Sequence, residues 1–390
     1  MTTADVTYFR SVLEAGRAAE RTGSSRKVVG VFCNFVPEEL IVAAGAIPVR
    51  LCAGSDEAAN ASEDIFPRDI CPVSRASLGL LRREAFGRLD LAVVPLVCDA
   101  KTKLAAAAAQ FVPVHLMTVP RSKTDAGAEK LWSEQVQALK RRLENLTGST
   151  IGWRELQQAI KLLDRRNLAL RRLLELRRRD DPPLSGLDLL TIVGASFEDG
   201  PASWTEQVER LCAELEQTGP CHPERSEGSR RPRILLAGAP LIYPNFKLAE
   251  VIEQAGATIV ADDLCSCTQR LYNRVVPEEW TVKAMMRALA EATLLPSICP
   301  CFADSADRLT RLLELVRGFR VDGVIHHTLR LCCLFDADSH QVHRALRERG
   351  IPFLNLHTDY SREDTAQLRT RVEAFLEVIA AGRMVSAPPG

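Results

Sequence analysis

The chain has 390 residues, of which 46% are hydrophobic and 26% charged, a composition typical of a soluble globular protein of two to three domains. Lys and Arg total 50, as do Asp and Glu, and this zero net charge argues against a basic nucleic-acid-binding protein. There is no apolar run long enough to span a membrane, and the first residues lack the regions of a signal peptide. We therefore expect a cytoplasmic protein without a nucleic-acid or membrane partner.

The first part of the chain predicts a parallel α/β unit. A periodic, helical segment runs to about residue 26, and Pro37 followed by two acids opens another helix, which ends at Gly45. Apolar, β-branched runs bounded by turn residues predict strands. They are 28–32, 47–51, 91–96 and, more weakly, 112–119.

The middle of the chain changes to helical periodicity. Residues 129–179 are rich in Leu, Arg and Glu, and Gly148 and Gly152 divide them into at least two helices. Acids alternate with the basic residues at 140–142 and 171–179, which predicts a salt-bridged, solvated face or a dimer surface. A further helix ends at Glu216, and the polar, turn-rich residues 218–233 predict a linker.

The second part repeats the alternation of strand and helix. Strands are expected at 234–237, 258–261, 321–325 and 353–356, with a helix at 247–254. Alternating elements imply parallel sheets covered on both faces. The predicted fold is α/β, with two flavodoxin/Rossmann-like parallel-sheet domains, an N-terminal helical segment and a helical middle insert at about 125–216. The predicted domains are 1–217 and 234–390, joined by 218–233.

Cysteine is the unusual residue of this chain, with 12 copies. In a reducing compartment so many cysteines indicate metal, cluster or redox chemistry. Six follow a repeated order of strand end, Cys-Pro step and strand end, which resembles a degenerate internal duplication. They are Cys33, Cys71 and Cys98 in the first half and Cys265, Cys299 and Cys332 in the second.

These positions suit a shared ligand, because ligands of parallel sheets gather at the carboxyl ends of the strands. Thiolates bind zinc or iron–sulfur clusters. The close pairs lack the two-residue spacing of zinc knuckles, so we favour a buried cluster, with structural zinc and simple packing as alternatives. Cys52, Cys212 and Cys221 are interpreted as structural. Three neighbours of candidate ligands remain possible substitutes, namely Cys267, Cys301 and Cys333.

Several motifs resemble those of one known family. They are GVFCNFVPEELIVAAGAIPV at 30–49, CPVSRAS at 71–77, CDAKTK at 98–103, DDLCSCTQR at 262–270, DGVIHHTLRLC at 322–332 and the segment 357–375. In this order they resemble the 2-hydroxyacyl-CoA dehydratase / benzoyl-CoA reductase subunit family. The resemblance covers nearly the whole chain except the helical middle and the linker.

The resemblance implies two flavodoxin-like domains and an oxygen-sensitive iron–sulfur cluster in the crevice. A separate ATP-hydrolysing iron–sulfur activator would supply low-potential electrons. Ordinary subunits hold one [4Fe-4S] cluster through three cysteines, whereas the double-cubane subgroup, a set of homodimers, holds two bridged cubanes through six. All six positions are cysteines here, so this chain resembles that subgroup. The resemblance thus carries over Cys33, Cys71, Cys98, Cys265, Cys299 and Cys332 as ligands.

The expected function is activator-dependent reduction of a small molecule. Near the ligands, Lys101, Lys103 and Arg75 are candidates to balance the cluster's charge, or else solvated cations. His326 and His327 are expected to end a strand near Cys332, where either could deliver protons or simply pack in the core. Two alternatives remain: a dehydratase subunit with one [4Fe-4S] cluster acting on a CoA thioester, and a non-catalytic electron carrier or redox sensor.

Overall fold

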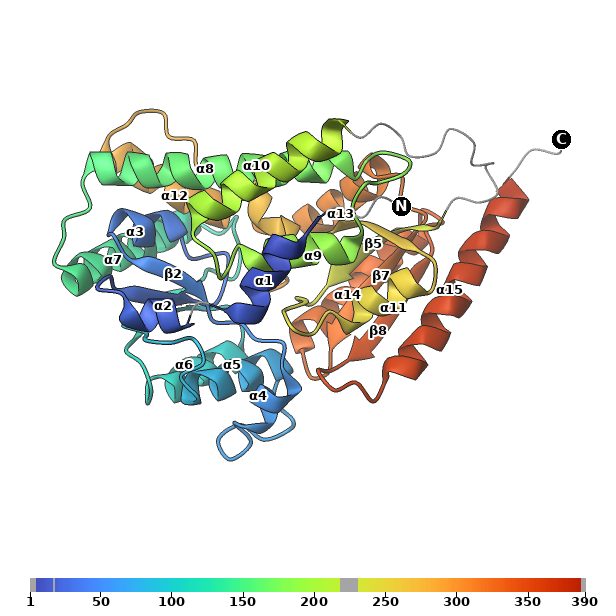
Figure 1. Cartoon of the computed structure of the whole chain (residues 1–390), viewed down its shortest axis with the longest axis horizontal. Coiled ribbons are helices and arrows are strands. Elements are labelled where there is room, and N and C mark those ends of the chain that lie inside the picture. Colours follow the sequence, from blue (N-terminus) through green and yellow to red (C-terminus); the bar gives the residue numbers. More distant parts are fainter. Residues whose placement is uncertain (1–4, 17, 218–230, 387–390) are drawn as a thin grey trace.

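Two four-stranded parallel sheets form the framework of the chain, shown as a computed structural model in Figure 1. The structure describes residues 5–16, 18–217 and 231–386. The first sheet has the order β2-β1-β3-β4 and the second the order β6-β5-β7-β8. The strands are β1 Val28–Val31, β2 Ile47–Arg50, β3 Leu91–Leu96, β4 Val114–Thr118, β5 Arg233–Gly238, β6 Thr258–Asp262, β7 Gly323–Leu329 and β8 Phe353–Thr358. The predicted α/β class with two parallel sheets is confirmed.

Helices cover both sheets and form a layer that spans them. The first half contains α1 Thr7–Ala15, α2 Ala18–Gly23, α3 Glu38–Ala43, α4 Asp56–Asn60, α5 Pro72–Arg82 and α6 Asp99–Ala108. The middle contains α7 Ala128–Thr147, α8 Trp153–Leu176, α9 Gly186–Ala195 and α10 Pro201–Gln217. The second half contains α11 Lys247–Gln254, the 3-10 helix η2 Thr268–Tyr272, α12 Val282–Leu294, α13 Ala306–Gly318, α14 Cys333–Arg347 and α15 Thr365–Ser386. In Figure 1, α8 and α10 lie side by side along the top of the molecule.

The two halves exchange helices. Helix α12 of the second half packs against α7, and the indole of Trp132 donates a 2.9 Å hydrogen bond to Thr293. Conversely, α1 packs against α9, and Phe9 and Leu189 belong to the same hydrophobic cluster as Ile259 of β6. Each sheet therefore buries apolar side chains contributed by the other half of the sequence. Of the predicted linker, residues 218–230 lie outside the described residues.

Strand β7 is longer than its sequence suggests. We expected it to end at Ile325, but it continues through His326 and His327 to Leu329, and all seven residues are buried. The error has a physical cause: two histidines and a threonine look like a strand end, yet all of their polar side-chain atoms except His327 Nε2 have partners in the interior. For example, His327 Nδ1 lies 3.0 Å from the carbonyl oxygen of Ala239.

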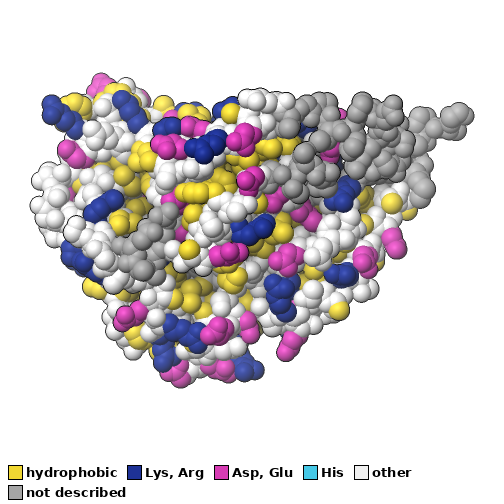
Figure 2. All heavy atoms as spheres, in the orientation of Figure 1, with side chains coloured by type: hydrophobic (Ala, Val, Ile, Leu, Met, Phe, Trp, Pro, Cys, Tyr) yellow, Lys and Arg dark blue, Asp and Glu magenta, His cyan; other side chains and the backbone are white. Residues whose placement is uncertain are grey.

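Charge is mixed over the surface, as the composition predicts. Figure 2 shows Lys and Arg side chains interspersed with Asp and Glu on the visible face. On the middle helices, Lys140 pairs with Glu144 at 2.6 Å and Arg172 pairs with Glu216, which confirms the predicted salt-bridged face. Within the described ranges, none of the helices combines the length and the apolar character needed to cross a membrane.

Candidate functional site

All six cysteines of the repeated pattern line one cavity of about 590 Å³. We call it the cysteine cavity. Three of the thiols come from the first half and three from the second, and its walls also include Arg50, Lys101 and Phe335. The predicted convergence of Cys33, Cys71, Cys98, Cys265, Cys299 and Cys332 is therefore confirmed, while their role as ligands stays a prediction.

Strand ends bring four of these thiols together. Cys33 follows β1, Cys98 follows β3, Cys265 follows β6 and Cys332 follows β7. Because all strands of each sheet are parallel, their carboxyl ends meet at one edge, where doubly wound folds bind their ligands. The two Cys-Pro steps supply Cys71 and Cys299 from the connections that precede α5 and α13.

Helix N-termini point at three of the cysteines. Cys71, Cys98 and Cys332 are the N-cap residues of α5, α6 and α14. Backbone N–H groups of Val73 and Ser74 donate to the Cys71 sulfur. The positive end of a helix stabilises a thiolate and, more generally, an anion. These N-termini therefore favour negative charge in the cavity.

The thiols also interact across the boundary between the halves. A hydrogen bond from Cys332, aided by the N–H groups of α5, lowers the pKa of Cys71 to about 7 against the effect of burial. Burial, followed by the nearby Cys299, raises the pKa of Cys33 to about 11. Burial is also the main cause that raises the pKa of Cys98 and Cys265. Most of these thiols are therefore protonated when nothing is bound, and a bound metal would displace their protons.

The cysteines surround the cavity and do not meet at one point. Within the described residues there is no group of three His, Cys, Asp or Glu side chains placed to hold a metal ion. A structural zinc ion needs four donors at about 2.0–2.3 Å. The arrangement thus offers no preformed site for a single ion.

Two cations face the cavity. The Lys101 ammonium lies 4.3 Å from the centre of the Phe32 ring and is buried without a hydrogen-bond acceptor. Arg50 donates a 2.7 Å hydrogen bond to Asn34, while its Nε is buried and has no partner. A buried cation without an acceptor costs free energy, so the Lys101 ammonium favours an anion in the cavity. Arg50 already pairs with Asn34 and Glu38, and only its Nε lacks a partner. Among the other predicted cations, Arg75 is buried but does not line the cavity, and Lys103 is exposed.

Cys52 is a seventh thiol in the cavity wall. We expected it to pack in the core, but it is only half-buried and donates to the carbonyl oxygen of Phe32 at 3.3 Å. Cys52 follows β2, the strand that corresponds to β6 of the second sheet. The topological counterpart of Cys265 is therefore Cys52, not Cys33. The strand order is thus the same in the two halves, whereas the positions of the cysteines on the strands differ.

Among the described residues, the remaining cysteines lie outside the cavity wall. Cys267 and Cys301 are buried, and Cys333 is exposed. A hydrogen bond with Cys301 is the main cause that raises the pKa of Cys299, so Cys301 touches a candidate ligand without lining the cavity. Cys212 is buried in α10, as expected of a structural cysteine. Cys221 lies outside the described residues.

Neither candidate proton donor lines the cysteine cavity. His326 Nε2 lies 3.4 Å from Asp338 Oδ2, and its ring centre is 6.5 Å from that of Phe335, a cavity residue. Burial lowers the pKa of His327 to about 4, which leaves that imidazole neutral at pH 7. Proton delivery by these histidines stays a prediction, and any route from them would pass through the side chains that separate them from the cavity.

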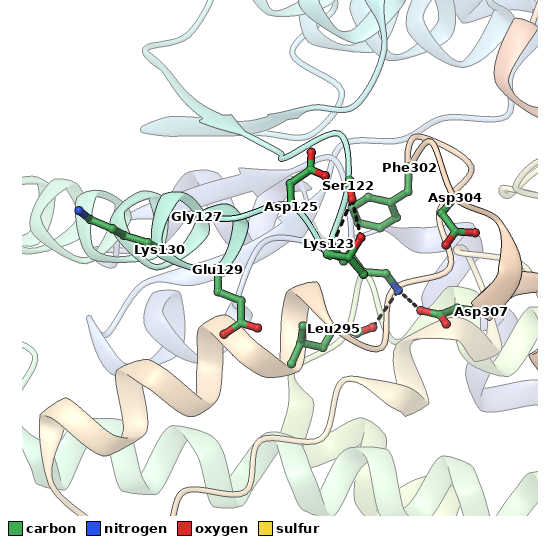
Figure 3. A pocket seen from close by; sticks show the side chains of 11 residues that line it. Ser122, Lys123, Asp125, Gly127, Glu129, Lys130, Leu295, Phe302, Asp304 and Asp307 are labelled. Carbon is green, nitrogen blue, oxygen red and sulfur yellow. Dashed lines mark hydrogen bonds and ion pairs between the residues drawn. The ribbon is translucent and has the colours of Figure 1, made fainter.

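A second, more open pocket of about 890 Å³ lies near the N-terminus of α7. Figure 3 shows Lys123 directed toward Asp307 and the carbonyl group of Leu295. Lys123 also donates to the carbonyl oxygen of Ser297 at 2.9 Å. Its ammonium is thus saturated by the protein itself. This pocket contains none of the six cysteines, so we place the functional site in the cysteine cavity.

Residues 33–379 match the model of the family described as 2-hydroxyglutaryl-CoA dehydratase, D-component. The chain belongs to this family. The match begins at Cys33, just after β1, and covers the other seven strands and every cysteine of the cavity. The family expected from the sequence motifs is therefore confirmed.

Several relatives match this family member over nearly their whole length. YjiM of Escherichia coli (strain K12), a candidate dehydratase subunit, is 33% identical over 90% of this chain and 91% of its own. The (R)-phenyllactyl-CoA dehydratase beta subunit of Clostridium sporogenes is 25% identical over 92% of this chain and 93% of its own. A benzoyl-CoA reductase subunit of Thauera aromatica is 24% identical over 94% of both chains. Dehydratase and reductase subunits thus both occur among the relatives.

Proposed function

We propose that this member of the family is an iron–sulfur reductase whose six cysteines hold a double-cubane cluster. It would receive low-potential electrons from a separate ATP-hydrolysing iron–sulfur activator and pass them to a small molecule. One observation carries the proposal: six thiols, three from each half, line a single cavity. Two cubanes with three protein ligands each would use all six.

The residues present fit such a group. Soft thiolates are the preferred protein ligands of iron–sulfur clusters, and six of them spread around a cavity match a polynuclear group better than one ion. A cluster with six thiolates is strongly anionic. The helix N-termini behind Cys71, Cys98 and Cys332 and the Lys101 ammonium offer the compensating positive charge.

The chain's own residues would bind the group, exclude water and set its electrostatic surroundings. When bound, the cluster supplies one-electron chemistry at low potential. Backbone N–H groups from α5, α6 and α14 would donate to the ligating sulfurs, and such hydrogen bonds tune a cluster's reduction potential. Apolar wall residues such as Phe32, Phe35 and Phe335 would restrict the access of water. Arg50 and Lys101 would balance the negative charge of the cluster.

A second function has a specific observation in its favour. The relatives include a named dehydratase beta subunit and a named reductase subunit, and such names describe proteins that work with other subunits. The alternative is therefore a dehydratase subunit with one [4Fe-4S] cluster that acts on a CoA thioester beside a second subunit. The proposed reductase would instead be a homodimer.

Six single Cys→Ser variants test the proposal. Each is purified anaerobically and analysed for iron and acid-labile sulfide, with Cys212→Ser as the control because Cys212 is buried outside the cavity. We expect iron to fall in all six variants and to stay at the wild-type level in the control. Loss of iron only in the variants of Cys33, Cys71 and Cys98 would contradict the double cubane and support the single-cluster alternative.

A further inference from the structure

The most deeply buried ion-pair network beside the cavity is built around Arg308 of α13. Its side chain is 2% exposed. Its guanidinium forms an ion pair of 2.9 Å with Asp263, donates through Nε to Asp338 Oδ2 at 2.8 Å and donates through Nη1 to the carbonyl oxygen of Ile298 at 3.4 Å. One side chain therefore contacts three separate segments, two through hydrogen bonds and one through an ion pair.

Each of these segments carries one cysteine of the second half. Asp263 lies two residues before Cys265, and Ile298 directly precedes Cys299. Asp338 lies in α14, the helix that Cys332 caps. Within the described ranges, Arg308 forms no hydrogen bond or ion pair with the segments of Cys33, Cys71 and Cys98. The contacts are thus specific to one set of three thiols.

The two carboxylates that face Arg308 are themselves held in place. The second oxygen of the Asp263 carboxylate accepts a 3.0 Å hydrogen bond from the backbone N–H of Gly238, at the end of β5. The Asp338 carboxylate lies 3.4 Å from His326 Nε2, in β7. Two strands of the sheet therefore anchor the carboxylates that Arg308 bridges. Since breaking a buried ion pair leaves an uncompensated charge, these contacts resist local opening.

The geometry also requires arginine. Its planar guanidinium presents five donors in a rigid fork, whereas a lysine ammonium is a single compact charge on a flexible stem. Two hydrogen-bond acceptors and one ion-pair partner, on three segments, call for nitrogen atoms that point in different directions within one plane. Lysine at this position would keep the positive charge but could not hold all three segments at once.

We propose that Arg308 is a positioning residue that sets the relative placement of Cys265, Cys299 and Cys332 through their three segments. The identity of what these cysteines hold rests on the function proposed above, but their placement does not. Arg308 acts behind the cavity wall, since it is not itself a wall residue. Without it, the second-half thiols lose their fixed spacing while the first-half thiols keep theirs.

The test compares Arg308→Lys and Arg308→Met with Arg177→Met. Arg177 is a matched control because it is also fully buried, at 0% exposure, and bonds to backbone carbonyl groups, including those of Val260 and Ser185. Iron-free, reduced protein is alkylated briefly with iodoacetamide and each cysteine is quantified by peptide mass spectrometry. The exposed Cys333 serves as the internal reference.

Alkylation of a buried thiol reports local opening of its segment. We expect both Arg308 variants to raise the alkylation of Cys265, Cys299 and Cys332 by about tenfold over that of the first-half cysteines, and Arg177→Met to leave this ratio unchanged. Arg308→Lys retains the charge, so it provides the readout if Arg308→Met does not fold. A uniform rise at all six thiols, or the same ratio in Arg177→Met, would overturn the proposal.

Iron content separates this proposal from the proposed function. After anaerobic reconstitution, we expect the Arg308 variants to hold about half the iron of the wild type, because one of two cubanes loses its ligand geometry. A wild-type protein that binds no iron would refute the proposed function and leave the alkylation test of Arg308 intact. Equal iron in wild type and variants, without selective alkylation, would overturn the role of Arg308.

Discussion

Glu38 forms ion pairs with three arginines beside the cysteine cavity. Replacing it with glutamine should lower the free energy of unfolding of the protein. Its carboxylate lies 2.7 Å from Arg166 of α8, 3.3 Å from Arg270 of η2 and 4.0 Å from Arg50 of the cavity wall. The side chain is 15% exposed. Glu38→Gln keeps the shape of the side chain and removes the charge that this cluster of arginines shares.

The magnitude follows from the pKa. Burial alone would raise the pKa of Glu38, but the three arginines outweigh it and bring the pKa from 4.5 to about 2. At 1.36 kcal/mol for each pH unit, the ionised carboxylate contributes about 3 kcal/mol of stability at pH 7. The contribution is complete above the unfolded-state pKa and is lost as the pH falls toward 2. By pH 3.5 about 2 kcal/mol should remain.

Urea unfolding of the iron-free protein, followed by tryptophan fluorescence, measures this difference. Glu57→Gln is the control, because Glu57 pairs with Arg83 while 79% exposed, and such surface pairs contribute about 0–1 kcal/mol. We expect Glu38→Gln to lose about 3 kcal/mol at pH 7 and less at pH 3.5. A loss no larger than that of Glu57→Gln, or an equal loss at both pH values, would refute the reasoning.

Three further predictions concern buried groups near the cavity. Burial raises the pKa of Glu39 to about 7, so the free energy of unfolding should fall as the pH rises from about 4.5 to 7. In urea unfolding at pH 8, Glu39→Gln should therefore be more stable than the wild type. A less stable variant would contradict this prediction. Lys101→Met should raise the melting temperature of iron-free protein, since it removes a buried ammonium without an acceptor. The same variant should lower the melting temperature of reconstituted protein. A decrease in both forms would be inconsistent with an anion in the cavity. If either histidine delivers protons, the His326→Gln/His327→Gln variant should keep its iron and lose about a hundredfold in activator-dependent turnover, and unchanged turnover would exclude the role.

Elements with strong local signals could be predicted closely from the sequence. The strand at 91–96 and the helix at 247–254 have the predicted bounds in the structure, because an apolar run between turn residues and a glycine-terminated amphipathic helix are encoded within a few residues. The gathering of the cysteines followed from topology, since parallel strands place their carboxyl ends together. The same rule, applied to the strand before Cys52, would have placed this seventh thiol in the cavity wall.

The buried charges beside the cavity could not be predicted in this way. Arg308 meets Asp263 and Asp338 across 45 and 30 residues of sequence. Nothing local to α13 distinguishes this buried arginine from the two other arginines of the same helix. The same holds for Arg50 of β2, because its surroundings are formed where α8 and η2 approach that strand. Such networks depend on how distant elements pack. The exchange of α1 and α12 between the halves was missed for the same reason.

Iron and acid-labile sulfide per chain, measured on wild-type protein purified without oxygen and with zinc measured in parallel, test the central claim most directly. Two cubanes held by the six cysteines of the cavity predict about eight irons per chain with a similar amount of sulfide. About four irons would contradict the double cubane and support the single-cluster dehydratase subunit. Zinc without iron, found again after anaerobic reconstitution, would contradict the redox function altogether.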